Sequence, residues 1–481
     1  MKTLVWQDIV SAFRGTRSDW RIRRPSPPRL PRLGVSWVGP VILIAATAVG
    51  WFAFADAVGE EEDVAFSLFI GSVSILLMAW SNLLSTRLRF LEPFFGGLDL
   101  MYRWHRWFGA LSVAAMWLHI QYVDDVEGIR GASEDIADAA EELAGLGETV
   151  LYVLIIASLI RWVPYRWWRQ SHKLLIFPFA TASWHFHTST KPYANDSLWG
   201  RWFQVIMIAG IVAWMYRVLW RDGVMRGRRY EVVAVNNNGS TVTVDLAATG
   251  RPLKWRAGQF VFVRIGAGAL SEPHPFTIAS VSTDGYVRLV VKSLGDWSEQ
   301  LGARVTVGDP ARVEGPYGRL HLFPRTRRTV VWIAGGVGVT PFLAGCRVRR
   351  DGVVPHLFYV ARSRDDAPGL EELTKAARAG RIVLHLHVSE EGTRLRAEDL
   401  FDEFGEEGLR NSHVVMCGPD LLVHDMTTAV RSLGARHVHV EKFDIRTGVG
   451  PDLSREVDDV LQAVRQRFQQ RNEEHSDAIQ R

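Results

Sequence analysis

Cysteine is scarce in this chain of 481 residues. Only two are present, Cys346 and Cys417, and both lie in the second half. This scarcity excludes a disulfide framework and a thiolate metal cluster. Any metal or haem in this protein therefore needs a different kind of ligand.

The sequence also has no large excess of either charge. It contains 56 Lys and Arg and 52 Asp and Glu, which gives a net charge of +4. The basic residues do not gather into a folded patch, so we expect no nucleic-acid partner. The sequence contains no calcium loop of the EF-hand type, which argues against calcium control through this chain. Its 47% hydrophobic and 11% aromatic content excludes fibrous and disordered classes.

Long apolar runs are plentiful in the first half, where 16 of the 19 Trp precede residue 221. Each run can cross a bilayer core of about 30 Å. The runs are 35–56, 65–84, 105–123, 149–165, 172–189 and 200–220. We predict a six-helix transmembrane domain over residues 35–222. The alternative is a soluble helical domain with buried helices.

Charge alternates along these runs, and this predicts their orientation. The arm 1–34 is rich in Arg and lacks the apolar core and cleavage site of a signal peptide. The first loop and the segment 124–148 are acidic, whereas Arg residues follow the second, fourth and sixth runs. The rule that cytoplasmic loops carry Lys and Arg predicts a multi-pass plasma-membrane protein with both termini in the cytoplasm.

Histidines at membrane depth are candidate functional residues, since ionisable groups are costly there. His105 and His119 lie on the third run, and their 14-residue separation keeps them on one helix face about 21 Å apart. His172 and His185 lie at matching depths on the fifth run, with His187 just beyond. Facing imidazoles predict axial ligation of two b-type haems. The alternative for each histidine is a hydrogen-bonded core residue.

The outer ligand on the fifth run has two candidates. A separation of 13 residues turns an ideal helix about 140° out of line, whereas 15 residues turn it only about 60°. Ideal geometry therefore favours His187 over His185. Pro178 lies between His172 and both candidates, and it is expected to kink the helix.

The second half of the sequence has short β segments in place of long apolar runs. Short β segments at 230–235, 241–246, 260–265 and 286–291 predict an antiparallel β-barrel over 226–324. From residue 325 to 446, strands alternate with a Gly-rich turn and helices, which predicts a doubly wound α/β domain. In that domain Gly335, Gly336 and Gly338 follow a strand, so backbone N–H groups there could receive a pyrophosphate.

Seven motifs follow one another in a defined order. They are Ala257–Phe260, His274–Ser280, Gly295–Ser298, Glu314–Gly318, Ala334–Pro341, Cys417–Pro419 and Glu441–Phe443. This series resembles the ferredoxin-NADP reductase superfamily. Joined to a six-span domain with paired histidines, it resembles the membrane branch of that superfamily, the NADPH oxidases and ferric reductases, in a prokaryotic form.

The resemblance implies roles for residues in the cytoplasmic half. The strand His274, Pro275, Phe276 and Thr277 would carry FAD, with Thr277 near the isoalloxazine edge, and Ser298 would help to hold the pyrophosphate. The nicotinamide-nucleotide loop would include Gly336, Gly338, Thr340 and Pro341, with Cys417 beside the nicotinamide and Phe443 stacked on the flavin. The oxidase-type spacing of 13 residues implies His185, rather than His187, as the outer ligand.

Two further segments carry expectations. Arg362 and Arg364 follow the second strand of the nucleotide domain, where an Arg can pair with a 2′-phosphate, so NADPH is favoured. Asp365 and Asp366 leave NADH open. The tail 447–481 has one apolar helical stripe that we expect to pack on its own reductase domain. A partner helix or a regulatory contact is the alternative, and the regulatory partner is unknown.

The predicted function is transmembrane electron transfer from cytosolic NAD(P)H, through FAD and two haems, to an extracellular acceptor. Dioxygen, reduced to superoxide, needs only access to the outer haem edge. A ferric chelate is an alternative acceptor, and a partner protein docked on the acidic segment 124–148 is another. A non-enzymatic haem-storing protein would leave all seven motifs without a use.

Overall fold

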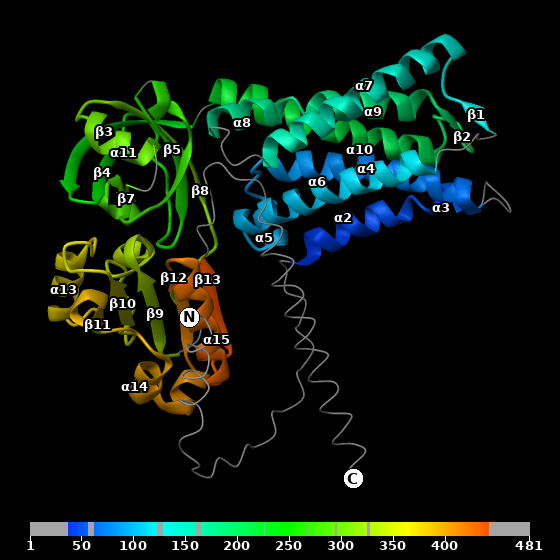
Figure 1. Cartoon of the computed structure of the whole chain (residues 1–481). Helices are drawn as coiled ribbons and strands as arrows, with labels where there is room; N and C mark the ends of the chain where they lie inside the picture. Colours follow the sequence, from blue (N-terminus) through cyan, green and yellow to red (C-terminus); the bar gives the residue numbers. More distant parts are fainter. Residues whose placement is uncertain are drawn as a thin grey trace, which may run out of the picture.

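The computed structural model describes residues 37–55, 62–122, 128–159, 165–225, 227–266, 268–293, 296–324 and 328–441. The arm 1–34, the tail 447–481 and Phe443 lie outside these residues. Helices occupy the first half and two β-sheets the second (Figure 1). The helices are α2 Val38–Val49, α3 Phe52–Ala55, α4 Glu62–Ser85, α5 Glu92–Phe95, α6 Leu98–Gln121, α7 Glu134–Leu159, α8 Tyr165–Lys173, α9 Ile176–Thr188 and α10 Leu198–Met215, which continues as η2 Tyr216–Met225.

The helical part exposes large apolar side chains and buries several serines within an otherwise apolar core. Helix α4 packs against α6 and α10, and α7 packs against α9. Large apolar side chains such as Ile42, Ile156 and Val205 are 57–64% exposed on its surface. Serines lie buried within it instead: Ser67, Ser72, Ser74, Ser81 and Ser112. This distribution is typical of a bundle that faces lipid rather than water.

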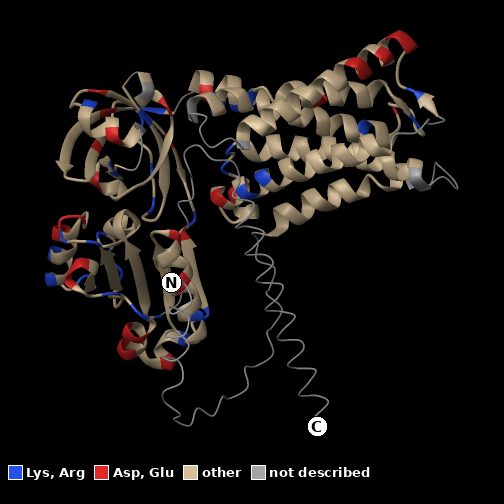
Figure 2. Cartoon of the chain, in the orientation of Figure 1, with Lys and Arg blue, Asp and Glu red and all other residues tan. Residues whose placement is uncertain are grey.

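Two described helices, Val64–Ser85 and Leu198–Met225, are by themselves long and apolar enough to cross a membrane. The predicted first run is interrupted between α2 and α3, and the fifth is divided into α8 and α9. Helix α7 begins at Glu134, well before the predicted run 149–165, so part of the acidic segment 124–148 is helical. Figure 2 shows Asp and Glu at the tip of α7 farthest from the sheets.

The break between α8 and α9 follows from Pro178. The turn is centred on Leu174, whose N–H donates to the carbonyl of Ser171 rather than continuing the α-helical ladder. A proline has no N–H to donate to the carbonyl four residues earlier, and its ring crowds that carbonyl. Four residues before Pro178 is Leu174, where the helix is interrupted. Ideal-helix arithmetic therefore does not apply between His172 and His185.

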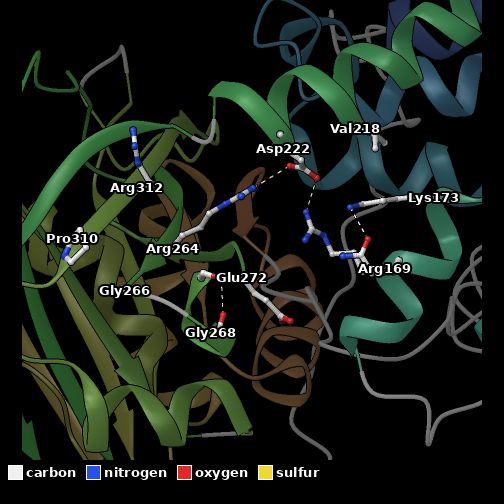
Figure 3. Close-up of a pocket in the computed structure, with 13 residues that line it drawn as sticks. Arg169, Lys173, Val218, Asp222, Arg264, Gly266, Gly268, Glu272, Pro310 and Arg312 are labelled. Atoms are coloured by element: carbon white, nitrogen blue, oxygen red, sulfur yellow. Dashed lines mark hydrogen bonds and ion pairs between the residues drawn. The ribbon is translucent and has the colours of Figure 1, made fainter.

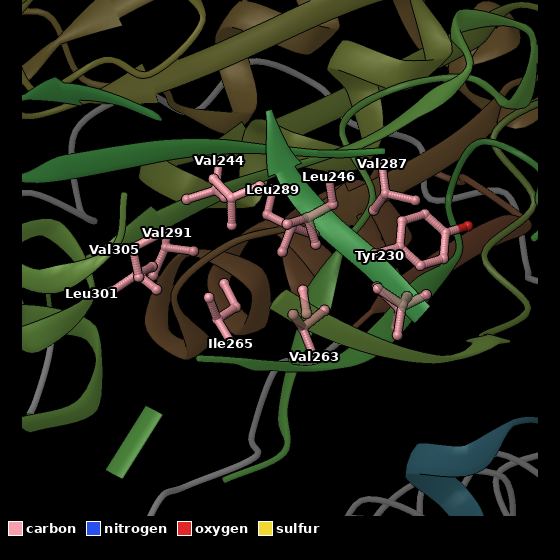
Figure 4. Close-up of a cluster of buried hydrophobic side chains, with 14 of the residues drawn as sticks. Tyr230, Val244, Leu246, Val263, Ile265, Val287, Leu289, Val291, Leu301 and Val305 are labelled. Carbon is pink, nitrogen blue, oxygen red and sulfur yellow. The ribbon is translucent and has the colours of Figure 1, made fainter. Parts of the chain in front are cut away.

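The first sheet is antiparallel and has six strands. They are β3 Arg228–Asn238, β4 Thr241–Ala248, β5 Phe260–Ile265, β6 His274–Thr277, β7 Tyr286–Lys292 and β8 Pro310–Tyr317, in the order β6-β5-β8-β3-β4-β7. An isolated bridge between Ile278 and Leu289 joins the β6 edge to β7. The sheet curls around a core that includes Val244, Val263 and Leu289, closed by Leu301 of α11 Asp296–Arg304 (Figure 4).

The second sheet is parallel and has five strands. They are β9 Val330–Gly335, β10 His356–Ala361, β11 Val383–Val388, β12 His413–Cys417 and β13 His437–Glu441, in the order β11-β10-β9-β12-β13. Alternate residues of β9 enter two separate cores, with Trp332 on one face and Ile333 on the other. Helices α12 Thr340–Gly345 and α13 Leu370–Arg378 cover the first face, and α14 Ala397–Arg410 and α15 Asp420–Ser432 the second. This is the doubly wound arrangement that the sequence predicts.

Candidate functional site

The two histidines of α6 are held by the backbone of α4. The Nδ1 atom of His105 lies 2.8 Å from the carbonyl oxygen of Ser81, and that of His119 lies 2.9 Å from the carbonyl oxygen of Ser67. Ser67 and Ser81 are 14 residues apart on α4, as His105 and His119 are on α6. Because the two helices run antiparallel, both histidines therefore meet a serine carbonyl. A ring that donates its Nδ1 proton to a carbonyl keeps Nε2 as a lone-pair donor, the arrangement common for metal-ligating histidine.

His172 faces His105 from the end of α8. Their ring centroids are 6.1 Å apart at an interplanar angle of 70°. An iron held by two imidazoles at about 2 Å from each nitrogen places the ring centroids roughly 6 Å apart. The ring of His172 stacks on Trp168 at 5.0 Å, which fixes its orientation. Its buried Nδ1 has no hydrogen-bond partner among the described residues.

His185 and His187 differ in their surroundings. His185 is half-buried, with a buried Nδ1 that lacks a hydrogen-bond partner in the described part of the chain. His187 is exposed, and its Nδ1 lies 3.5 Å from the amide nitrogen of Gln204. Of the two side chains, His185 is therefore the one that faces the protein interior.

The strand β6 carries His274, Pro275, Phe276 and Thr277 next to α11. Trp297 of α11 packs against His274 at 4.4 Å and stacks on Phe276 at 5.4 Å between ring centroids. Burial, with a smaller contribution from Arg169, lowers the pKa of His274 to about 4, so its imidazole is neutral. The hydroxyl of Thr277 is buried and has no hydrogen-bond partner among the described residues. A buried hydroxyl of this kind fits a polar edge of a bound flavin.

Trp297 packs in the candidate site, and the sequence identified it only as part of a motif. Its large ring covers the β6 residues, and its buried Nε1 lacks a partner in the described structure. Ser298 follows it in the first turn of α11. The signal available in the sequence was an aromatic residue immediately before the predicted pyrophosphate-binding serine.

The Gly-rich loop after β9 meets the end of β12 at the point where strand order reverses. Such a switch point is where doubly wound sheets bind nucleotides. Gly336 has a φ of +52°, and a Cβ on Gly338 would collide with the backbone carbonyl of Cys417. Thr340 and Pro341 begin α12 and are buried. These residues bring the backbone of both strand ends within reach of one ligand.

Cys417 is fully buried at the end of β12. Burial, assisted by the charge of Glu441, raises the pKa of its thiol well above the ordinary value. The side chain is therefore a neutral thiol that contributes shape to the crevice rather than a reactive thiolate.

Arg362 and Arg364 stand at the exposed carboxyl end of β10. Arg362 pairs with Glu390 at 3.0 Å, and Arg364 pairs with both oxygens of Glu391 at 2.7 and 3.1 Å. Exposed ion pairs of this kind are weak, so either guanidinium can be recruited by a phosphate.

Glu441 is a second residue that the sequence reasoning named only as part of a motif. It lies opposite Cys417 in the β12–β13 register, and its Oε2 is buried without a hydrogen-bond partner among the described residues. Burial, with a contribution from Asp99, raises the pKa of Glu441 to about 8. A carboxylic acid that is neutral near pH 7 thus lies at the nucleotide crevice.

Glu441 predicts a pH dependence of stability. Its folded pKa of about 8 exceeds its ordinary value of 4.5. Ionising this buried carboxyl costs free energy, so stability is unaffected below pH 4.5 and decreases, by up to about 1.4 kcal/mol per pH unit, until about pH 8. We expect Glu441→Gln to flatten this part of the profile, measured by denaturant unfolding between pH 5 and 9. Parallel profiles for both proteins would contradict the assignment.

Two buried ion-pair clusters join the helices to the first sheet. Glu314 of β8 contacts Arg87 at 3.5 Å and Arg221 at 3.0 Å, and it accepts a hydrogen bond from Tyr317 at 2.8 Å. Arg87 has a left-handed φ of 57°, which is uncommon outside glycine. Its guanidinium stacks 3.5 Å from the centre of the Phe262 ring. Several contacts thus hold one strained residue at the junction.

The second cluster borders a cavity of about 680 Å³ between α8, η2 and the β5–β6 connection. Asp222 lies at its rim and pairs with Arg169 at 2.6 Å, Arg217 at 2.5 Å and Arg264 at 3.1 Å. Figure 3 shows Arg264 of β5 and Arg169 of α8 both reaching Asp222, with Lys173 and Arg312 also lining the cavity. The site between helices and sheet is therefore strongly basic.

Two protein-family profiles match the chain. Residues 70–183 match the ferric reductase like transmembrane component, and residues 226–323 match an FAD-binding domain. The first match contains His105, His119 and His172 and ends two residues before His185, and the second contains β6 and α11.

Relatives share different lengths of this chain. The carnitine monooxygenase reductase subunit of Escherichia coli K12 is 32% identical over 222 residues, 43% of this chain and 64% of that protein. The probable cell surface ferric reductase kap2 of Aspergillus oryzae is 25% identical over 298 residues, 56% of this chain and 39% of that protein. Ferric reduction oxidase 7 of Arabidopsis thaliana is 28% identical over 122 residues, 21% of this chain and 16% of that protein. The chain thus spans less than two thirds of the length of each.

The chain thus combines a region similar to the ferric reductase like transmembrane component with a region similar to an FAD-binding domain. This is the combination that the order of its motifs predicts, and relatives named as ferric reductases are among the proteins that it resembles.

Proposed function

We propose that this protein carries electrons from cytosolic NADPH across the plasma membrane to an extracellular acceptor, with FAD and two b-type haems as the carriers. The observation that carries the proposal is the 6.1 Å pair of His105 and His172 inside a lipid-facing bundle. That pair lies at the end of the bundle to which the FAD-binding sheet is attached.

The proposed topology has six spans: α2 with α3, α4, α6, α7, α8 with α9, and α10 with η2. The basic junction faces the cytoplasm together with both sheets, and the acidic tip of α7 faces outward, following the preference of Lys and Arg for the cytoplasmic side. The acidic tip is visible in Figure 2.

Residues on facing helices would hold the two haems. His105 and His172 would be the inner pair, and His119 with His185 the outer pair. The carbonyls of Ser81 and Ser67 orient the α6 rings through their Nδ1 protons, which would leave Nε2 of each ring to hold a haem iron. Stacking on Trp168 orients His172.

Residues of the sheets would position FAD and the nicotinamide nucleotide. The Thr277 hydroxyl would donate to the flavin edge, His274 and Phe276 would contact its ribityl region, and Ser298 would hold its pyrophosphate. FAD supplies the conversion of a two-electron hydride into single electrons, which haem iron requires. The loop from Gly335 to Gly338 would bind the nucleotide pyrophosphate at the start of α12, with Thr340 and Pro341 shaping the loop.

Further roles concern the nicotinamide end and the choice of nucleotide. Cys417 would lie beside the nicotinamide, and Phe443 would stack on the flavin. Arg362 and Arg364 would exchange their glutamate partners for a 2′-phosphate, which favours NADPH over NADH.

Dioxygen is the proposed acceptor, giving superoxide, because reduction of oxygen needs only contact with the outer haem edge near His185. A ferric chelate is the second candidate, favoured by the relatives named as ferric reductases.

One experiment tests the route and the acceptor together. Purified protein is supplied with FAD and then with NADPH or NADH without oxygen, while the haem spectrum is followed. Oxygen or ferric citrate is then admitted, with and without superoxide dismutase. We expect haem reduction, faster with NADPH, and reoxidation by oxygen through a dismutase-sensitive product. Absence of haem, or an unchanged haem spectrum, would overturn the proposal.

Gly71 gives a separate prediction for the outer haem site. A Cβ at this position would lie 2.9 Å from Nδ1 of His119, against the ring that bonds to Ser67. We expect Gly71→Ala to displace the ring and to weaken outer-haem binding roughly 10–100-fold, the range seen when a ligand's supporting contact is lost. Haem content and haem titration measure the effect.

The matched control is Gly109→Ala, whose nearest contact would be the Ser81 hydroxyl at 3.9 Å. This variant should retain both haems. Full haem content in the Gly71 variant would show that the outer haem site does not require the close approach of His119 to Gly71.

A further inference from the structure

A group of metal-ligand side chains lies in the nucleotide domain, away from the proposed electron route. It consists of His356 on β10, His385 on β11 and Glu403 on α14, with one potential ligand atom each, all within 4.8 Å of one another. His356 Nδ1 lies 3.3 Å from Nε2 of His385 and 3.3 Å from Oε1 of Glu403. The three groups converge on one point from three elements that are separate in sequence.

The two separations of 3.3 Å match a metal centre. Four ligands at 2.0–2.1 Å around a tetrahedral zinc ion lie roughly 3.3–3.4 Å from one another. The same separations are long for hydrogen bonds, whose usual range is about 2.7–3.2 Å. His356 Nδ1 also faces both partners at once, although a neutral ring offers only one proton or one lone pair there. A cation satisfies all three groups together.

Packing fixes the two rings in place. Parallel pairing sets Phe358 opposite His385, and their rings stack at 4.2 Å with an interplanar angle of 4°. Phe404 contacts the ring of His356 edge-on at 4.8 Å. Glu403 precedes Phe404 on α14 and is partly exposed. Its carboxylate can therefore move closer to the two imidazole rings.

The group lies at the opposite end of the sheet from the nucleotide loop. His356 begins β10 in register with Val331, whereas Gly335 is in register with Val360 at the other end. Four residues of strand separate the two positions by roughly 13 Å. A metal here would tie α14 to the sheet without touching the nucleotide.

We propose that His356, His385 and Glu403 form a binding site for a divalent zinc ion, with water in the fourth position. Imidazole and carboxylate together suit zinc. The site anchors α14 to β10 and β11, and it is independent of the proposed electron transfer.

Full-length protein purified with a histidine-free tag tests this proposal. After chelator treatment, each variant is dialysed against graded Zn²⁺, and zinc per chain is measured by mass spectrometry, separately from haem iron. Glu403→Gln and His385→Asn remove one ligand each. Glu407→Gln is the control, because Glu407 is an exposed residue of the same helix and lies outside the cluster.

We expect the wild type and the Glu407 variant to bind one more zinc ion than the two ligand variants, or to bind it at least about tenfold more tightly. Zinc should also raise the thermal unfolding midpoint only where the site is intact. Equal zinc binding in the wild type and the Glu403 variant would overturn the proposal. That variant changes an exposed side chain, so the test stands even if the His385 variant does not fold.

Discussion

His172→Ala is expected to lower the haem content from two per chain to one and to reduce electron transfer from NADPH to the external acceptor to background. His172 approaches His105 at 6.1 Å between ring centroids, so its loss would leave the proposed inner haem with one histidine ligand instead of two. Reduction of the flavin by NADPH should be unchanged, because the nucleotide crevice lies in the second sheet. Anaerobic stopped-flow spectroscopy resolves these two steps.

His187→Ala is the matched control on the same helical segment. His187 is exposed, so this variant should keep both haems and full activity. If it instead loses the outer haem, the outer ligand is His187 rather than His185. Two intact haems in the His172 variant would contradict the inner pair.

Periodicity and residue spacing predicted the features of this site that recur at regular intervals along the chain, such as the apolar runs and the paired histidines. The spacing of His105 and His119 was visible because a helix converts sequence separation directly into depth. Their supports were not visible, because Ser67 and Ser81 act through backbone carbonyls, which every residue has. The choice of His185 came from family resemblance. The helix break four residues before Pro178 removes the ideal-helix argument for His187.

Contacts between distant segments could not be predicted from local patterns. Glu314 was recognised within a motif, yet its partners Arg87 and Arg221 lie far away in sequence and were read only as topology signals. Trp297 and Glu441 likewise belonged to recognised motifs, but their burial depends on how strands and helices pack. Sequence reasoning therefore identified the elements of the site better than the contacts between them.

Glu314→Gln is expected to weaken the attachment of the FAD-binding sheet to the helices. Glu314 and Arg87 have side chains only 7% and 8% exposed, and Arg221 shares the same carboxylate. Removing one partner of a buried ion pair leaves an uncompensated charge, at a cost of about 3–5 kcal/mol. Reduction of haem by NADPH should slow while flavin reduction continues, because the junction orients one cofactor site against the other.

The same carboxylate predicts acid sensitivity. Burial alone would raise the pKa of Glu314, but the charges of Arg87 and Arg221 outweigh it and hold that pKa at about 2, below the ordinary 4.5. Its contribution is therefore complete above pH 4.5 and is lost as the pH falls toward 2. The difference in unfolding midpoint between the wild type and the Glu314 variant should shrink over that interval.

Glu231→Gln provides the comparison, since Glu231 is an exposed residue of β3 in the same sheet. It should match the wild type in stability and in the rate of haem reduction. A Glu314 variant with wild-type stability and wild-type haem reduction would mean that the guanidinium groups find other partners. The junction would then be held by the apolar contacts of Phe262 and Tyr317 with the helices, rather than by charge.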